Sequence, residues 1–385
     1  MATSRQASHD PVADAPLVSV VVVNHNRAEM LRECLRSLIH QTYPNLEIWV
    51  VDNGSRDGSL EIVESFDEPR LHSIALPDNR GFAAANNLAF ERAGGDFVAL
   101  LNNDAVADPG WLAALMEAIQ EAPSVGMCAS KILFAGTRVI DKAGHLIYPD
   151  GQNRGRGTGE QDQGQFESLE EALFPDGCAA LYRRRLLEEA AGFDCQFFAY
   201  ADDADLGLRA RWMGWGCLYV PAARVHHRHS STSGRFSPQK IYWVERNRYW
   251  LAVKNLPLSW LMASPFLTAY RWAHNLGAAL RGRGAAGNFR RQASLGRLAL
   301  TVLKALLDGL LGTPRMWRKR RRLRRRRRLS DRQFKQLLRR FRISARDVAL
   351  REYEGEFQAE AQRRKRKESE GRKQESGRKE VEPQP

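Results

Sequence analysis

Val98-Ala99-Leu100-Leu101-Asn102-Asn103-Asp104 is the segment from which the fold of this chain can be worked out. Four apolar residues predict a buried strand, and a polar Asn-Asn-Asp tip follows them directly. Open α/β sheets bind ligands at the carboxyl ends of their strands, so the Asp104 carboxylate is well placed to bind a metal ion or a phosphate. The same tip could simply form a turn, and the neighbouring segments must decide between these two interpretations.

The segments around this strand predict an alternation of strands and helices. The β-branched run at 17–23 is typical of a central strand that helices bury on both faces. Parallel strands need a crossover connection, usually a helix, so the alternation predicts an α/β fold with a mostly parallel central sheet of the nucleotide-binding kind, flanked by helices. The expected strands are 17–23, 46–51, 72–76 and 97–101, and the expected helices are 28–40, 60–66 and 83–93.

The middle of the chain gives weaker patterns. Strands of a mixed sheet are expected within 131–148, followed by a mobile loop at 151–164 that is rich in Gly, Gln and Asn. A strand at 176–182 precedes a helix at 183–191. A short strand at 217–220 is expected to end at Pro221, where a loop begins.

Two clusters in this region could carry chemistry. Asp202, Asp203 and Asp205 precede a helix expected at 207–213, and a helix cap needs only one carboxylate. His226, His227 and His229 fall within four positions, which suits metal ligands. They could equally be ordinary surface histidines, and spacing alone leaves both interpretations open.

Charge divides the chain unevenly. Residues 255–385 hold 34 Lys and Arg against 12 Asp and Glu, whereas the first 254 residues hold 25 and 33. The basic character therefore belongs to the C-terminal third. Five dispersed cysteines without a CxxC pair favour reduced thiols and argue against a zinc site. The polar segment 1–15 lacks an apolar signal core, so we expect a disordered N-terminus and no secretion.

Seven segments, in order, resemble glycosyltransferase family 2, whose members have the GT-A fold. The resemblance extends from Leu17 to about Leu256. Within the family it is greatest to bacterial rhamnosyltransferases of surface-polysaccharide assembly. The matching segments are VSVVVVNHNR, VVDNGSRDGS, NRGFAAANN, VALLNNDAVADPGWL, DGCAALYRR, GFDCQFFAYADDADLGLR and VHHRHSSTSG.

The resemblance implies two groups of residues that bind a nucleotide-sugar donor. The nucleotide base would be held by Asn24, Asn26, Arg27, Asp52 and Asn53. The ribose and diphosphate would be lined by Asn79, Arg80, Gly81 and Asn86. Asn102 and Asn103 would have supporting roles, with Asn102 standing where the family carries the first Asp of its Asp-x-Asp metal motif.

The resemblance also implies a metal site and a base. Asp104 and His227 would bind Mg²⁺ or Mn²⁺, with His226 as a competitor for the histidine position. A divalent cation neutralises the charge that grows on a departing diphosphate, and an inverting displacement needs a base for the acceptor hydroxyl. Asp203 is the expected base and Asp202 its neighbour in the motif. Clustered carboxylates raise one another's pKa, which suits a base that works near neutral pH.

The implied function is inverting transfer of a sugar, from dTDP-rhamnose or a UDP-sugar, to a lipid-linked or polysaccharide acceptor. One alternative is a nucleotidyltransferase acting on sugar phosphates, but residues 24–27 are not the Gly-rich loop such enzymes carry. The other is an inactive sugar-nucleotide-binding protein, against which Asp104, Asp203 and His227 argue.

The C-terminal third predicts a membrane-associating extension after a catalytic domain at 16–255. Residues 255–270 contain two prolines and are too short for a membrane-spanning helix. Residues 293–311 are amphipathic, and eleven basic residues follow in 315–328, which suits an anionic membrane surface better than nucleic acid in this context. One more helix is expected at 331–353. We therefore expect a helical extension at 256–353, a disordered charged tail at 354–385, and a cytoplasmic protein peripheral to the cell membrane.

Overall fold

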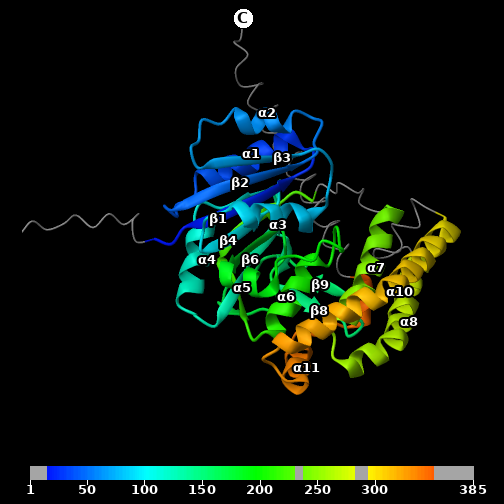
Figure 1. Ribbon diagram of the computed structural model, residues 1–385. Coiled ribbons are helices and arrows are strands. Elements are labelled where there is room, and N and C mark those ends of the chain that lie inside the picture. The colour runs from blue at the N-terminus through cyan, green and yellow to red at the C-terminus, as the bar shows by residue number, and fades with distance from the viewer. Residues whose placement is uncertain (1–14, 230–236, 282–293, 351–385) are drawn as a thin grey trace, which may run out of the picture.

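The computed structural model describes residues 15–229, 237–281 and 294–350 (Figure 1). The tail predicted at 354–385 and all but the last residue of the segment predicted at 1–15 lie outside these ranges. Within them, a central sheet is flanked by helices, and a group of helices from the C-terminal third packs on one side (Figure 1).

The N-terminal half of the sheet is parallel, as the alternation predicts. Its strands lie in the order β3-β2-β1-β4, and every pairing among them is parallel. Alternate residues of β1 contribute to separate apolar cores, since Val21 belongs to one and Val20 and Val22 to the other. The strands are β1 (Val18–Asn24), β2 (Leu46–Asn53), β3 (Leu71–Leu76) and β4 (Phe97–Leu101), and the helices between them are α1 (Ala28–Ile39), α2 (Ser59–Glu64) and α3 (Phe82–Arg92).

The other half of the sheet is mixed. Strand β11 (Ala179–Arg183) lies antiparallel between β4 and β6 (Val125–Phe134), and β12 (Gly216–His227) runs parallel to β6. The α/β prediction is thus confirmed, with the parallel arrangement confined mainly to the first four strands. The remaining elements are β5 (Ala105–Ala107), α4 (Trp111–Gln120), β7 (Ile140–Ala143), β8 (His145–Ile147), β9 (Asn153–Gly155), β10 (Glu170–Glu171), α5 (Arg184–Ala190) and α6 (Asp202–Trp212).

Three predicted boundaries in this half are wrong. Strand β12 does not end at Pro221, because a register shift between Val220 and Arg224 accommodates the residue that cannot donate a ladder hydrogen bond. Helix α6 begins at Asp202 instead of Gly207, so the carboxylates lie in its first turn, where the helix dipole favours them. The loop expected at 151–164 contains β9, which pairs with β8.

The C-terminal helices are longer or shorter than predicted. Helix α8 (Leu258–Leu280) continues through Pro265, and α10 (Leu295–Arg326) continues through Pro314 into the basic run. An internal proline costs a helix about 3 kcal/mol, which the remaining turns of these long helices offset. Helix α11 (Asp331–Arg340) ends well before residue 353, and α7 (Pro238–Asn255) precedes α8. No helix in the described ranges is long and apolar enough to cross a membrane.

These helices pack on the same core as the sheet. The Trp212 ring of α6 stacks on the buried Phe334 ring of α11, with centroids 3.8 Å apart. A buried ion network also ties α7 and α8 to the segment after β8. Arg271 Nε donates to Asp150 Oδ2 at 2.8 Å, and Arg248 Nε donates to Glu245 Oε2 at 3.0 Å. Neighbouring Arg271 and Arg248 outweigh the effect of burial and lower the pKa of Glu245 to about 2.

Candidate active site

A cavity of about 1400 Å³ opens at the carboxyl ends of the parallel strands. It collects side chains from β2, β4, α6 and β12, which are far apart in the sequence. Predicted site residues that line it are Asn53, Asn79, Gly81, Asn102, Asn103, Asp104, Asp202, Asp203 and His227. The other predicted residues, Asn24, Asn26, Arg27, Asp52, Arg80 and Asn86, are not among those that line it.

Asn24 and Asp52 form a buried network beneath the cavity. Asn24 Nδ2 donates to Asp52 Oδ1 at 3.1 Å, and Asn103 Nδ2 donates to Asn24 Oδ1 at 2.7 Å. The Ser55 N–H donates to Asp52 Oδ2 at 2.9 Å. These bonds join the ends of β1, β2 and β4, so the network holds the cavity floor in place.

Asn53 organises the loop before α3. Its Oδ1 accepts the Arg80 N–H at 2.8 Å, and its Nδ2 donates to Asn79 Oδ1 at 3.1 Å. Gly81 has a φ of 83°, and a Cβ there would meet the Phe198 carbonyl oxygen at 2.5 Å. Only glycine fits this position, because both its conformation and its surroundings exclude a side chain.

The remaining residues that were predicted to bind the nucleotide-sugar donor do not line the cavity. Arg80 directs its guanidinium to Asp78, with Nε and Oδ1 3.4 Å apart. The buried Asn86 donates to the Phe82 carbonyl at 2.9 Å, within its own helix. Asn26 and Arg27 both have positive φ, and Asn26 Oδ1 accepts the Arg56 N–H at 3.0 Å. In this conformation, Asn26 and Arg27 shape the turn that enters α1.

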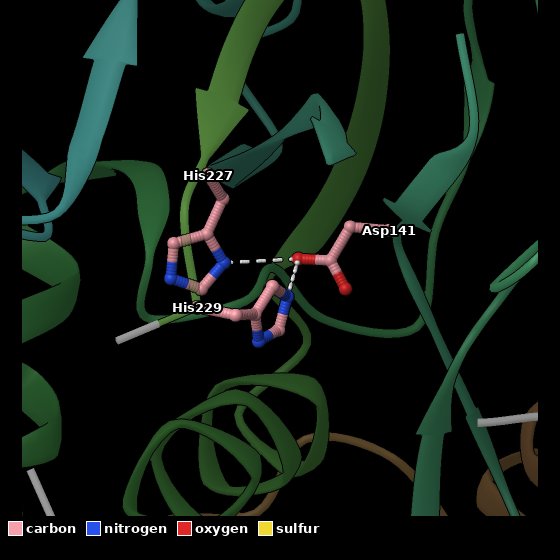
Figure 2. Close-up of side chains that lie close together, drawn as sticks. All are labelled: Asp141, His227 and His229. Carbon is pink, nitrogen blue, oxygen red and sulfur yellow. Dashed lines mark hydrogen bonds and ion pairs between the residues drawn. The ribbon is translucent and has the colours of Figure 1, made fainter. Parts of the chain in front are cut away.

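His227 lies between two carboxylates. Its Nε2 is 3.1 Å from Asp104 Oδ1, and its Nδ1 is 3.0 Å from Asp141 Oδ2. Figure 2 shows Asp141 reaching from β7 to His227 at the end of β12 and to His229 beyond it. Burial alone would lower the pKa of His227, but the Cys178 and Asp104 side chains outweigh it and hold that pKa well above its usual range.

These residues fit a divalent cation. Ligand atoms at right angles around an ion, with bonds of about 2.1 Å, lie about 3.0 Å apart, close to the distance between Asp104 Oδ1 and His227 Nε2. A histidine that ligates a metal commonly donates its other ring N–H to a carboxylate, and Asp141 stands in that position. Asp141, His227 and His229 also form one of two described groups compact enough to hold an ion.

The structure separates His226 from His227. They are neighbours on β12, so their side chains point to opposite faces of the sheet. His226 Nε2 lies 3.3 Å from Asp108 Oδ1, away from the cavity. His227 is the member of this pair that reaches Asp104.

Asp203 is connected to the strand tip through a short segment. The Gly177 N–H donates to Asp203 Oδ2 at 3.1 Å, and the Asn102 N–H donates to the Cys178 carbonyl at 2.8 Å. Residues 176–178 therefore lie between the Asp203 carboxylate and the tip that carries Asp104. The two predicted chemical groups, far apart in sequence, face one cavity from either side of this segment.

Asp202 and Asp203 have different surroundings. Burial and the neighbouring Asp203 raise the pKa of Asp202 to about 8, and its Oδ2 is buried without a hydrogen-bond partner among the described residues. Burial and the Asp176 carboxylate raise the pKa of Asp203 as well. Asp203 is only half-buried and its side chain accepts two backbone N–H groups, from Gly177 and Ala204.

A further cluster was not predicted. Asp176 Oδ2 lies 2.9 Å from both His145 Nε2 and Lys142 Nζ, and Asp176, His145 and Asp203 form the second group compact enough for an ion. Lys142 and His145 outweigh the effect of burial and lower the pKa of Asp176. Asp141 was missed too, whereas His229 was expected as one of three clustered histidines that could ligate a metal. Asp176 and His229 lie within segments that matched the family, whereas Asp141, Lys142 and His145 come from strands whose pattern was weak.

Comparisons with known proteins agree with the resemblance. Residues 19–190 match the model of "Glycosyl transferase family 2". The O-antigen biosynthesis protein RfbC of Myxococcus xanthus is 31% identical over 260 residues, which cover 64% of this chain and 20% of that protein. This chain thus spans only about a fifth of RfbC.

Two further proteins are similar over much of their length. The N-acetylglucosaminyl-diphospho-decaprenol L-rhamnosyltransferase of Mycobacterium tuberculosis is 27% identical over 242 residues, covering 57% of this chain and 78% of that enzyme. A solved structure of mannosyltransferase PcManGT from Pyrobaculum calidifontis, in complex with GDP-Man and Mn²⁺, aligns with a TM-score of 0.48 and 23% identity, covering 80% of this chain and 85% of that one. Residues 19–190 of this chain therefore form a domain that is similar to glycosyl transferase family 2.

Proposed function

We propose that this chain transfers a sugar, with inversion, from a nucleotide-diphosphate sugar to an acceptor hydroxyl. The observation that carries the proposal is the placement of Asp104, His227 and Asp203 around one cavity at the carboxyl ends of the parallel strands. The match of residues 19–190 to the family model supports the same reaction. A nucleotidyltransferase or an inactive binding protein is not favoured by either observation.

The donor would occupy the strand ends. Asn53, Asn79 and Gly81 supply polar groups and a close backbone approach there, and the Asn24–Asp52 network keeps this surface rigid. Asn102 and Asn103 line the same part of the cavity. A rigid polar surface binds the donor without reorganising, which is the form of site that favours transfer.

Asp104 and His227 would hold the metal ion, and Asp141 would orient His227. A divalent cation bound there neutralises charge on the leaving diphosphate. The imidazole in the ligand set favours Mn²⁺ over Mg²⁺, because Mg²⁺ prefers oxygen ligands throughout. The side chains of Asp104, Asp141 and His227 are all buried, so their charges are shielded from water.

Asp203 would accept the proton of the acceptor hydroxyl. The pKa of Asp203 is raised toward neutral pH, which suits a base. The Gly177 and Ala204 N–H groups hold its two carboxylate oxygens in place. Asp202 is a poorer base at neutral pH, because a carboxyl with a pKa of about 8 is mostly protonated there. Asp202 would instead be an uncharged carboxyl group beside Asp203.

The acceptor belongs to surface-glycan assembly, and dTDP-rhamnose or a UDP-sugar is the proposed donor. The mycobacterial relative is named as a rhamnosyltransferase, which supports rhamnose. We further propose that residues 256–353 form an extension that holds the enzyme on the cytoplasmic face of the cell membrane. We favour the membrane over nucleic acid as the partner of this extension. The eleven basic residues in 315–328 support this proposal.

The test is a panel of sugar nucleotides incubated with the full chain and either Mn²⁺ or Mg²⁺, scored for nucleoside diphosphate release. We expect release from one donor class, its loss on chelation, and its loss in Asp104→Ala. Asp108→Ala is a matched control, because Asp108 pairs with His226 outside the cavity. Release that survives both chelation and Asp104→Ala would overturn the metal-dependent reaction.

A further inference from the structure

Helices α8 and α10 carry almost all of the large apolar side chains that the described part of the chain leaves exposed. Of twelve such residues, eleven lie on these two helices. On α8, Met262, Phe266 and Tyr270 are spaced four apart, and on α10, Leu300, Leu303 and Leu307 are spaced three or four apart. Each set forms a stripe along one helix face. Exposed apolar side chains gathered on one surface mark a binding site for a partner, a lipid or a membrane.

The cavity at the strand ends continues between these helices. The apolar residues that line it there are Trp272, Leu276 and Ala279 of α8 and Leu298, Val302 and Leu306 of α10. We call this part the helical groove. Leu276, which lines it, is 54% exposed, and Leu303, which also lines it, is 52% exposed, so the groove opens where the stripes begin.

The size of the cavity leaves room for a second ligand. Pockets that enclose one small molecule measure about 300–1,000 Å³, and this cavity measures about 1400 Å³. Its polar part carries Asp104 and Asp203, whereas the helical groove is apolar. A ligand with a polar head and an apolar chain matches this division.

Lys240 is a cation in the lining that is available for an anionic group. Arg248 and Arg271 are paired with Glu245. Lys240 lies 5.7 Å from the centre of the Tyr200 ring and makes no ion pair with any residue of the described ranges. A phosphate on the ligand would find its counter-charge at Lys240.

We propose that the helical groove binds the apolar chain of a lipid-linked acceptor, in which a phosphate joins the lipid to a sugar that carries the acceptor hydroxyl. The acceptor is drawn from an anionic membrane on which the stripes of α8 and α10 lie. This proposal rests on the sugar transfer proposed above, because the head of the lipid must reach Asp203. Helix α10 carries both features that an interfacial helix needs, an apolar stripe followed by a basic run. The lipid then reaches the cavity from the surface that holds the enzyme.

The first experiment measures binding of dansyl-labelled geranylgeranyl phosphate to the full chain by fluorescence anisotropy. Val302→Trp fills the groove, and Leu300→Trp is its matched control, because Leu300 is 68% exposed on the same helix and does not line the cavity. We expect the Kd to rise at least about tenfold in Val302→Trp and to change less than about twofold in Leu300→Trp. Absence of saturable binding to the unaltered chain, or equal losses in both variants, would overturn the groove assignment.

A second arm isolates the phosphate. Lys240→Gln should weaken binding of the phosphate probe several-fold and leave binding of dansyl-labelled geranylgeraniol unchanged. Equal effects on both probes would remove Lys240 from the proposal, and with it the preference for a lipid phosphate.

The third arm tests the membrane. The full chain should sediment with vesicles of three parts phosphatidylcholine and one part phosphatidylglycerol. Leu307→Asp, on the exposed stripe, should reduce sedimentation, whereas Val302→Trp should retain it. If Leu307→Asp instead breaks a dimer and leaves vesicle binding unchanged, the stripe covers a second copy of this chain and the membrane proposal fails.

Nucleoside diphosphate release keeps this proposal separate from the proposed function. Probe binding needs no donor, and cleavage of the donor with water as the acceptor of the sugar needs no lipid. Release without saturable probe binding would overturn the groove alone. Probe binding without release from any sugar nucleotide would overturn the sugar transfer and, with it, the assignment of the lipid as its acceptor.

Discussion

The strand-end part of the cavity and its helical groove differ in how their side chains meet water. At the strand ends, Asn24, Asp52 and His227 are buried, and each is hydrogen-bonded to another side chain. On the helices, Leu300 and Leu303 expose 68% and 52% of their surface without any polar role. The comparison shows one region that is organised before a ligand binds and another whose apolar surface is left for a ligand or a membrane to cover.

The largest expected effect lies at the strand-end part of the cavity. Asp203→Asn should lower turnover by about two to four orders of magnitude, the range of general base catalysis, and leave donor binding unchanged. Turnover and nucleotide affinity are measured separately. Gln196→Ala serves as a control, because Gln196 is an exposed residue outside the cavity. Near-normal turnover in Asp203→Asn would show that another group accepts the proton.

The next prediction tests whether the C-terminal helices are part of the folded core. Phe334→Ala should reduce the free energy of unfolding by about 3–5 kcal/mol, because it removes a fully buried ring stacked on Trp212. Chemical denaturation measures the change. Arg339→Ala, an exposed position on the same helix, should change stability by less than about 0.5 kcal/mol. Equal stability in the two variants would mean that α11 folds independently of the sheet.

A smaller effect is expected behind the metal site. Asp141→Asn should weaken metal affinity about 10- to 100-fold. The neutral amide replaces the carboxylate that accepts the His227 ring N–H, so it orients the ring less firmly. Isothermal titration with Mn²⁺ measures this directly. Asp162→Asn is a suitable control, since its carboxylate pairs with Lys131 outside the cavity. Unchanged Mn²⁺ affinity in Asp141→Asn would place the ion elsewhere, for example at the His145, Asp176 and Asp203 group.

The smallest expected effect is a pH dependence of stability. The pKa of Asp202 is raised to about 8 in the folded chain, above its value of about 3.9 when unfolded. The stability it contributes is therefore present below pH 4 and is lost as the pH rises through 8. Asp202→Asn should flatten this decline, with a difference in Tm of a few degrees, since 1 kcal/mol shifts Tm by about 2–4 °C in a domain of about 150–250 residues and by less in a longer chain. Parallel Tm curves for the two proteins would contradict the raised pKa.

Much of the parallel half of the sheet could be predicted because its signals are local. The apolar run of β1 and the helical spacing of α1 each need only neighbouring residues, and both elements end within one residue of expectation. Strand β12 could not be predicted in the same way. Whether Pro221 ends a strand depends on the partner strand, and β6 accommodates it with a register shift.

The site shows the same division. Local patterns predict the strand tip at Asp104 and the carboxylates at Asp202 and Asp203, and residues 19–190 match the family model, because these signals are residue types at short spacings. Folding alone places Asp141 behind His227, turns His226 away from the cavity, and brings α8 and α10 to extend it. Those contacts join residues far apart in the sequence, and the residues around each of them do not reveal which distant side chain folding brings beside it.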